Sequence, residues 1–330
     1  MKRAFVTDRI VRLAKQMKAK VILEPDYGFV GHITFRNNKK TLFRDTSFNI
    51  NPLGSVQIAK DKGYSAFFLK KFGYKVPDAV AIFSKKINAN VKRKKNAEDG
   101  FLFAKSIGFP VIIKPNDKSK GEGVTKVYNK SEYAAICRKL LKTNNVVLIQ
   151  EFCNGNDYRI VVLDGEIISA YQRLPLTVIG NGKSTILQLL MSLQKKFKKD
   201  GRDTVIDIND PRINLTLKRH KLTFNTILAK DKAVSLLPNA NLSSGGTAVD
   251  VTDKMHPTFR KLAINVTKDM CLRLCGVDIL TDDIAKPIDK YKIIEINAAP
   301  GLDNYSSIGK KQDKIVDGLY KKILLALEKL

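Results

Sequence analysis

The chain has 330 residues, 44% of them hydrophobic, and its 59 lysines and arginines outnumber 32 acids, which gives a formal net charge of +27. That length suffices for two or three lobes with buried cores, while no apolar run reaches the length of a signal sequence or of a membrane span. Four cysteines are too few for a disulfide scaffold. We therefore expect a cytoplasmic protein with no membrane partner.

The positive charge is spread along the chain, and its densest runs are residues 92–95, 195–199 and 310–311. Nucleic-acid-binding proteins neutralise phosphates with basic clusters, but these runs do not form the aromatic-interleaved platform that binds single strands. We do not expect nucleic acid as the main partner. The charge also suits the attraction of an acidic substrate, such as a peptide rich in aspartate or glutamate.

The apolar spacing of the chain predicts helices and strands in both halves. We expect a helix or strand–helix mixture over residues 1–20 and a hairpin around a polar turn over residues 29–44. A helix closed by Gly73 is predicted over residues 58–72, and a buried strand over residues 110–113. After residue 130 the spacing predicts a helix over 131–141, strands over 146–150, 158–163 and 166–173, and helices over 184–199, 256–274 and 314–330. Cys271 and Cys275 are four residues apart, so we expect them to share a helix face, where they pack and do not bind a metal.

Residues 114–124 follow the buried strand directly and have the composition of a phosphate-binding loop. A lysine at a strand end, Lys114, delivers a fixed positive charge, and Gly121 and Gly123 let backbone N–H groups approach phosphate oxygens. The spacing matches neither a P-loop nor the glycine motif of a dinucleotide-binding unit. A hairpin turn without a ligand has a similar pattern, so the loop alone leaves both interpretations open.

A second polar cluster lies far downstream, with Asp278 on one strand and Glu295 and Asn297 on an adjacent one. Residues i and i+2 of a strand face the same side, so Glu295 and Asn297 point together into a cleft. Ile294 and Ile296 then face a core. Mg²⁺ takes one or two carboxylates and completes its octahedron with water and phosphate oxygens, so the cluster predicts a magnesium site. Polar residues that cap a turn are the alternative.

Together these segments resemble the ATP-grasp superfamily, in particular the cyanophycin synthetase type and the glutathione-synthesising module of the bifunctional glutathione ligases. The likeness runs from about Ile58 to the C-terminus and includes residues 150–159, residues 164–166 before Arg173, and residues 241–253. It implies an α+β ATP-grasp fold in which the nucleotide is held between two α+β subdomains. We expect a short N-terminal region with a hairpin, an N-terminal lobe and a C-terminal lobe, over residues 1–54, 55–157 and 158–330.

The resemblance implies ATP as the cofactor and assigns its phosphates to the first lobe. Lys62 and Lys114 are the implied pair that neutralises the α- and β-phosphates, since lysine acts as a compact point charge. Either lysine is otherwise an ordinary charged residue at a helix or strand end. The implied phosphate contacts of the glycine loop are Ser119, Lys120, Gly121 and Gly123.

Adenine and ribose are assigned to the strand end that follows. The resemblance implies that the Gln150 side chain meets the adenine amino group and that the backbone of Glu151 and Cys153 meets the adenine edge. Asp157 would accept hydrogen bonds from the ribose hydroxyls. Without the resemblance, the pattern of residues 150–153 predicts a strand end followed by a loop.

Metal ligands and catalytic groups are implied in the second lobe. Asp278, Glu295 and Asn297 are the implied ligands of two Mg²⁺ ions, with Mn²⁺ as a substitute, that bridge to the β- and γ-phosphates. Arg159 and Arg173 stand where related ligases bind the transferred phosphate or the substrate carboxylate, both of which suit a guanidinium fork. Asn297 also begins a turn whose N–H groups would stabilise an oxyanion. A loop that covers the acceptor is implied at Asn241, Ser244, Gly245 and Gly246.

The implied function is an ATP-dependent carboxylate–amine ligase that forms an amide or peptide bond through an acyl phosphate, on a small amino acid or a peptide. A glutathione-synthetase-like or a peptide-tailoring ligase is the alternative within that chemistry. A basic nucleic-acid-binding or scaffold protein on a degenerate ATP-grasp fold is the alternative outside it. The N-terminal region that usually helps to recognise the carboxylate substrate is short, so acceptor choice is open, and a homo-oligomer is left open too.

Overall fold

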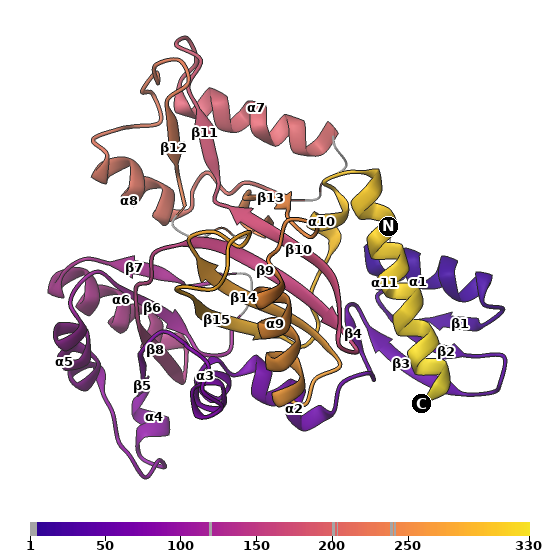
Figure 1. Ribbon diagram of the computed structural model, residues 1–330. Helices are drawn as coiled ribbons and strands as arrows, with labels where there is room; N and C mark the ends of the chain where they lie inside the picture. The colour runs from indigo at the N-terminus through magenta and orange to yellow at the C-terminus, as the bar shows by residue number, and fades with distance from the viewer. Residues whose placement is uncertain (1–4, 119–120, 200–201, 203, 238–239, 241) are drawn as a thin grey trace.

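The computed structural model describes residues 5–330 except 119–120, 200–201, 203, 238–239 and 241. A five-stranded antiparallel sheet in the order β13-β10-β9-β14-β15 lies in the middle of the molecule (Figure 1). Its strands are β9 (Asn156–Leu163), β10 (Glu166–Leu174), β13 (Thr247–Asp250), β14 (Leu274–Thr281) and β15 (Lys292–Asn297). Because successive side chains of a strand point to opposite faces, both faces of this sheet carry apolar residues that need cover.

Three helices cover one face of the central sheet. They are α2 (Leu53–Lys60), α3 (Lys62–Lys71) and α9 (Pro257–Asp269). Their inward apolar side chains form one buried cluster with Ile160 and Val162 of β9 and Val277 of β14. The sequence analysis assigned residues 55–157, which include α3 and most of α2, to the first lobe, and these domain boundaries stay a prediction.

The N-terminal region and the C-terminal helix cover the other face. These elements are α1 (Phe5–Gln16), β1 (Lys20–Leu23), β2 (Val30–Thr34), β3 (Lys40–Arg44), β4 (Ser47–Phe48), α10 (Asp303–Ser306) and α11 (Lys310–Lys329). Their buried side chains pack against Val161 and Tyr171 of the central sheet. Arg9 of α1 forms ion pairs with Asp313 and Asp317 of α11, so the two ends of the described chain are packed into one unit.

A second sheet, in the order β5-β8-β6-β7, lies beside the central sheet (Figure 1). This lobe consists of β5 (Ala79–Phe83), α4 (Lys85–Asn88), α5 (Ala97–Ile107), β6 (Val111–Pro115), β7 (Thr125–Val127), α6 (Lys130–Thr143) and β8 (Val146–Glu151). Helices α5 and α6 pack on one face with Val111, Ile113 and Ile149. The alternate residues Lys114 and Gln150 therefore face away from these helices.

An insertion between β10 and β13 forms a small unit with its own core. It contains β11 (Thr177–Ile179), α7 (Ile186–Lys199), α8 (Pro211–Arg219), β12 (Ala233–Ser235) and the short 3₁₀ helix η1 (Leu242–Ser244). Helix α8 contacts the N-terminal lobe, since Arg219 forms an ion pair of 2.8 Å with Glu132 and lies 4.0 Å from the centre of the Tyr128 ring.

The predicted hairpin and the strands predicted at 146–150, 158–163 and 166–173 are confirmed. The single helix predicted over 58–72 is wrong, because the chain breaks at Asp61, whose backbone is extended and whose carboxylate caps α3 by accepting from the Tyr64 N–H. Apolar spacing continued across the break and concealed it.

The helix predicted over 256–274 ends at Asp269. Cys271 follows it with a left-handed backbone at φ 53°, and Cys275 is fully buried within β14. The expected shared helix face of these two cysteines is therefore wrong. No helix in the described part of the chain is long and apolar enough to cross a membrane.

Candidate active site

A row of charged residues crosses three strands of the central sheet. Strand pairing sets Arg159 of β9 opposite Asp278 of β14, and Asp278 opposite Glu295 of β15. Directly opposite residues of antiparallel strands point to the same face, so these three side chains are neighbours. These three side chains lie on the face of the central sheet that the N-terminal region covers at other positions of β9 and β14, such as Val161 and Leu274.

Two arginines surround the buried carboxylate of Asp278. Arg159 donates to both of its oxygens, at 2.6 and 2.7 Å, and Arg173 Nη2 lies 3.0 Å from Oδ2. Burial opposes ionisation, but the two guanidinium groups outweigh it and hold the pKa of Asp278 below its ordinary value. Arg173 also donates to Asp157, at 2.6 and 2.9 Å. Asp278, Asp157, Arg159 and Arg173 therefore form one network of ion pairs.

Glu295 and Asn297 lie side by side at the edge of this network, as their spacing predicted. With its amide oriented to suit both neighbours, Asn297 donates to Glu295 Oε1 at 3.0 Å and accepts from Arg159 at 3.1 Å. The expectation that Ile294 faces the core is wrong, because the pairing shifts so that Ile293 and Glu295 face consecutive residues of β14 and Ile294 is an extra, bulged residue. Ile293 is the residue that is buried.

Lys114 approaches the same place from the other sheet. Its side chain is 5% exposed and makes no ion pair with any carboxylate of the described residues. Burial lowers the pKa of Lys114 to about 8, and Lys62 acts in the same direction while Glu295 partly offsets the effect. The Lys62 ammonium lies 3.9 Å from the Glu295 carboxylate. Lys114, Lys62 and Glu295 thus meet between the two sheets.

Asn116 holds Lys62 in this position, and the sequence analysis did not identify it. Its amide oxygen accepts from the Gly63 N–H at 2.9 Å, and its amide nitrogen donates to Asp61 at 2.6 Å. Lys62 Nζ donates to the Lys118 carbonyl. Through these hydrogen bonds at the helix break, Asn116 connects the start of α3 to the segment that follows β6. The sequence signal that could have identified Asn116 is its position directly after Lys114 and Pro115, at the end of β6.

The glycine loop is described at Gly121 and Gly123, while Ser119 and Lys120 lie outside the described residues. Both glycines have a left-handed backbone, at φ 72° and 71°. A Cβ on Gly123 would come within 2.9 Å of the Pro115 ring. Arg212 of α8 donates to the Gly121 carbonyl at 3.2 Å. A guanidinium from the insertion therefore supports this loop, and nothing in the local sequence indicates that contact.

The predicted adenine-binding segment lies where β8 ends. Gln150 is buried on the same face as Lys114, because its strand partner Ile112 is two residues before Lys114. The Glu151 carboxylate accepts from the Asp78 N–H at 3.0 Å and from Lys292 of β15 at 2.9 Å, which connects the two sheets. Burial raises the pKa of Cys153 to about 11, so its thiol is protonated at neutral pH.

The predicted acceptor loop lies beside Arg173. Ala248 pairs with Arg173 in the sheet, so the preceding residues 242–246 lead into this position, while Asn241 lies outside the described residues. Gly245 has φ 99°, a conformation that favours glycine. Arg202, which the sequence analysis did not identify, donates to the carbonyls of Leu242 and Gly246. The loop that contains Ser244 is thus fixed by a guanidinium from elsewhere in the insertion.

The donor set fits a hard divalent cation but not a soft one. Among the described residues no group of three or more His, Cys, Asp or Glu side chains is placed to hold a metal. Asp278 and Glu295 supply two carboxylates and Asn297 supplies an amide, which suits Mg²⁺ completed by water and phosphate oxygens. The carboxylate of Asp278 is occupied by Arg159, so a cation there would share it.

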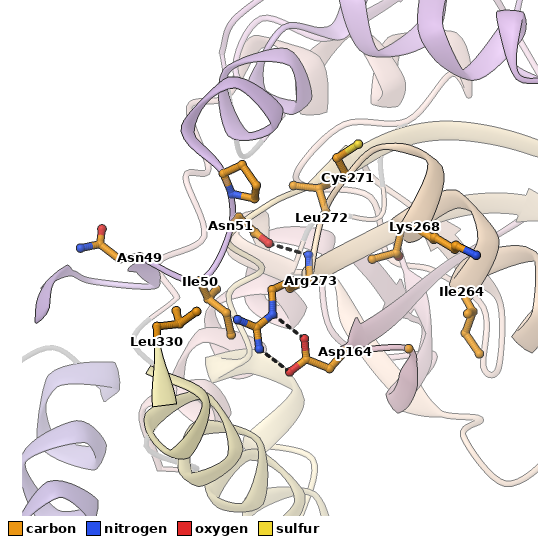
Figure 2. Close-up of a pocket in the computed structure, with 13 residues that line it drawn as sticks. Asn49, Ile50, Asn51, Asp164, Ile264, Lys268, Cys271, Leu272, Arg273 and Leu330 are labelled. Atoms are coloured by element: carbon orange, nitrogen blue, oxygen red, sulfur yellow. Dashed lines mark hydrogen bonds and ion pairs between the residues drawn. The ribbon is translucent and has the colours of Figure 1, made fainter. Parts of the chain in front are cut away.

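A cavity of about 760 Å³ lies elsewhere, at the far ends of β9 and β14 (Figure 2). Its lining includes the Arg273–Asp164 ion pair and Lys268, and none of its residues is a predicted site residue. Asn51 also borders it, accepting from the N–H groups of Arg273 and Leu274 and donating to the carbonyls of Leu274 and Ala298. Through Asn51 the cavity is linked to the carbonyl of Ala298, which follows Asn297.

Comparisons with known proteins agree with this geometry. The family described as D-ala D-ala ligase C-terminus matches residues 68–208, and the RimK-like ATP-grasp domain matches residues 238–317. Cyanophycin synthetase of Geminocystis herdmanii is 34% identical over 256 residues, which are 75% of this chain and 28% of that protein. The glutathione biosynthesis bifunctional protein GshAB of Pasteurella multocida is 30% identical over 280 residues, which are 82% of this chain and 35% of that protein.

The structure is similar to the crystal structure of a bifunctional glutathione synthetase from Pasteurella multocida. The TM-score is 0.62 at 22% identity, over 97% of this chain and 44% of that one. This likeness confirms the predicted α+β ATP-grasp fold. The chain spans about a third or less of the length of these two curated relatives. It carries ATP-grasp domains, and within that superfamily it resembles the ATP-grasp modules of cyanophycin synthetase and of bifunctional glutathione synthetase.

Proposed function

We propose that the chain is an ATP-dependent, ADP-forming carboxylate–amine ligase that forms an amide or peptide bond on an amino acid or a peptide. The observation that carries the proposal is the buried ammonium of Lys114, which has no carboxylate partner among the described residues and lies close to Lys62 and Glu295. A buried charge normally has a partner of opposite sign. A nucleotide phosphate between the two sheets would supply it.

In this proposal the two lysines bind the α- and β-phosphates, and the loop with Gly121 and Gly123 supplies backbone N–H groups. Gln150 and the backbone of Glu151 and Cys153 hold adenine. Asp157 would hold the ribose and is already oriented by Arg173. The ion pair between Glu151 and Lys292 links the strand end proposed for adenine to β15, the strand that carries Glu295 and Asn297.

Asp278, Glu295 and Asn297 would hold Mg²⁺, which supplies charge neutralisation at the β- and γ-phosphates. A substrate carboxylate attacks the γ-phosphorus, ADP leaves, and an amine then displaces phosphate from the acyl phosphate. Arg159 and Arg173 neutralise charge that develops on the transferred group. Both are preoriented by Asp278, so little reorganisation is needed in the transition state.

An acyl phosphate is consumed by water unless the site is closed. The segment with Ser244, Gly245 and Gly246 lies next to Arg173 and would cover the acceptor. Arg202 fixes two of its carbonyls. Asn297 begins the turn whose N–H groups would stabilise the tetrahedral oxyanion.

The substrate class follows from the relatives only in outline. Cyanophycin synthetase and a glutathione biosynthesis protein both match, which supports an amino acid or a peptide as the carboxylate partner. A glutathione-synthetase-like or a peptide-tailoring ligase is the alternative within this chemistry. The net charge of +27 favours acidic substrates over basic ones.

The test is a screen of amino acids and dipeptides with ATP and Mg²⁺, read by phosphate release and by mass spectrometry of the condensed product. We expect release that depends on one carboxylate and one amine substrate and that is lost in Glu295→Ala. Glu166→Ala is the matched control, because that exposed carboxylate pairs with Lys322 away from the site. DNA binding that falls steeply with salt and is unchanged by Glu295→Ala, without release, would instead identify a basic binding protein.

A further inference from the structure

Helix α3 has apolar side chains on its outward face as well as on its inward face. The inward residues Ser65 and Leu69 are buried against the central sheet. On the outward side Tyr64 is 64% exposed and Phe67 56%, and Phe68 is exposed too. A helix that is apolar all round is normally covered all round, so the outward side has the composition of a surface that binds something.

The exposed aromatic residues of the described chain gather at α3. Six aromatic side chains are exposed in the described part of the chain, and four of them are Tyr64, Phe67, Phe68 and Phe72. Phe67 and Phe68 follow Tyr64 by three and four residues, which places these three on one side of α3, and Phe72 follows the last residue of the helix. The Phe67 and Phe68 rings lie 5.3 Å apart and the Phe68 and Phe72 rings 6.1 Å apart. We call these four residues the aromatic face of α3.

Residues 60–75, which include the aromatic face, hold five lysines and one acid, Asp61, whose carboxylate accepts from the Tyr64 N–H. Lys60, Lys71 and Lys75 are exposed and make no ion pair with a carboxylate of the described residues, and the Lys71 ammonium lies 5.9 Å from the centre of the Phe67 ring. Lys70 is already neutralised by Asp78 at 2.8 Å. A second copy of this chain would bring like charges together, whereas a negatively charged partner would find a complementary rim.

We propose that the aromatic face of α3 is a docking site for an acidic peptide segment that also carries aromatic or aliphatic side chains. The apolar side chains of the segment pack on Phe67 and Phe68, where burial contributes most of the affinity. Its carboxylates lie next to Lys60, Lys71 and Lys75. The site is separate from the nucleotide site, because Lys62 at the start of the same helix is turned inward to Glu295.

The experiment measures binding of a fluorescein-labelled synthetic peptide of glutamate, leucine and phenylalanine by fluorescence anisotropy, with a twin in which lysine replaces glutamate. We expect the acidic peptide to bind at least about tenfold more tightly than its twin, and more weakly as salt screens the rim. The double variant Phe67→Ser/Phe68→Ser should lose about tenfold or more. Tyr27→Ser removes an exposed aromatic residue elsewhere and should bind as the wild type does.

Lys71→Glu keeps the aromatic rings and reverses one rim charge, so it should weaken the acidic peptide and strengthen the twin. Circular dichroism and thermal melting confirm that each variant is folded. Equal binding of the two peptides, or full binding by the double serine variant, would overturn the proposal. Self-association that the serine variant abolishes would assign the face to a second copy instead. Tighter binding of single-stranded DNA than of the acidic peptide, lost in the same variant, would assign it to nucleic acid. None of these readings requires ligase activity.

Discussion

The two sides of the candidate site differ in how their charges are balanced. On the central sheet the carboxylate of Asp278 is held by two arginines, and Arg173 also holds Asp157, so this side is neutralised by its own residues. On the neighbouring sheet Lys114 is as deeply buried but lacks a contacting carboxylate among the described residues. The first side is therefore preorganised without a ligand, while the second depends on one for its charge balance.

The largest expected effect is on the preorganised side. Asp278→Asn would remove the main counter-charge of buried Arg159 and one of the two counter-charges of buried Arg173, so we expect the free energy of unfolding to fall by about 3–5 kcal/mol. Asp164→Asn is the control, because its bidentate pair with Arg273 is exposed and should contribute about 0–1 kcal/mol. Urea denaturation measures both. Similar losses in the two variants would show that the buried network adds no more than a surface pair.

The ligand-dependent side should respond in the opposite sense. Lys114→Met removes a buried ammonium, so we expect unchanged or higher stability without a ligand, while affinity for a fluorescent ADP falls about 10–100-fold. Lys105→Met, on the exposed side of α5, should change neither quantity. Unaltered ADP affinity in the Lys114 variant would remove the main support for the nucleotide site.

The low pKa of Lys114 makes nucleotide affinity depend on pH. Below about pH 8 the Lys114 amine of the free protein is already protonated. Above that pH it is neutral, and nucleotide binding must be accompanied by proton uptake, because a phosphate stabilises the charged ammonium. Affinity for ADP should then fall as pH rises from 7 to 9, by at most about tenfold per unit above the pKa. Lys114→Arg, which keeps its charge, should flatten the profile. Calorimetry in two buffers should show proton uptake at pH 8.5 to 9 in the wild type alone.

The smallest expected effect is a loss of ADP affinity on substitution of Arg212 in α8, compared with substitution of Arg219 in the same helix. Arg212→Ala removes one hydrogen bond to the Gly121 carbonyl, so ADP affinity should fall about 2–10-fold. Arg219→Ala removes a contact between the same helix and the same lobe, but away from the glycine loop, and should have less effect on ADP. If both variants lose affinity equally, the insertion acts on the lobe as a whole and not through the loop.

The sequence predicted the parts of the site that depend on local order. Strand alternation correctly placed Glu295 and Asn297 together, and the resemblance located the lysines that the structure brings near Glu295. The bulge at Ile294 was not predictable, because it depends on how two distant strands pair. The same reason applies to Arg202 and Arg212, whose partners are about forty to ninety residues away.

The predicted helix boundaries were wrong for a different reason. Apolar spacing continues through Asp61, and only the carboxylate cap and the extended backbone there end one helix and start the next. After Asp269 the chain leaves α9 through Cys271 in a left-handed conformation, although that residue is not glycine. Periodicity records which face is apolar, not where the chain changes direction. The pairing of arginines with Asp278 and Asp157 likewise required the sheet register.

The four hydrogen bonds of Asn51 have a consequence for how the molecule opens. This one side chain ties the segment before α2 to the start of β14 and to the turn after β15. The amide protons of Arg273 and Leu274 should therefore exchange with deuterium only when the first fifty residues detach, which makes those residues part of the same cooperative unfolding unit as the strands that carry Asp278 and Glu295.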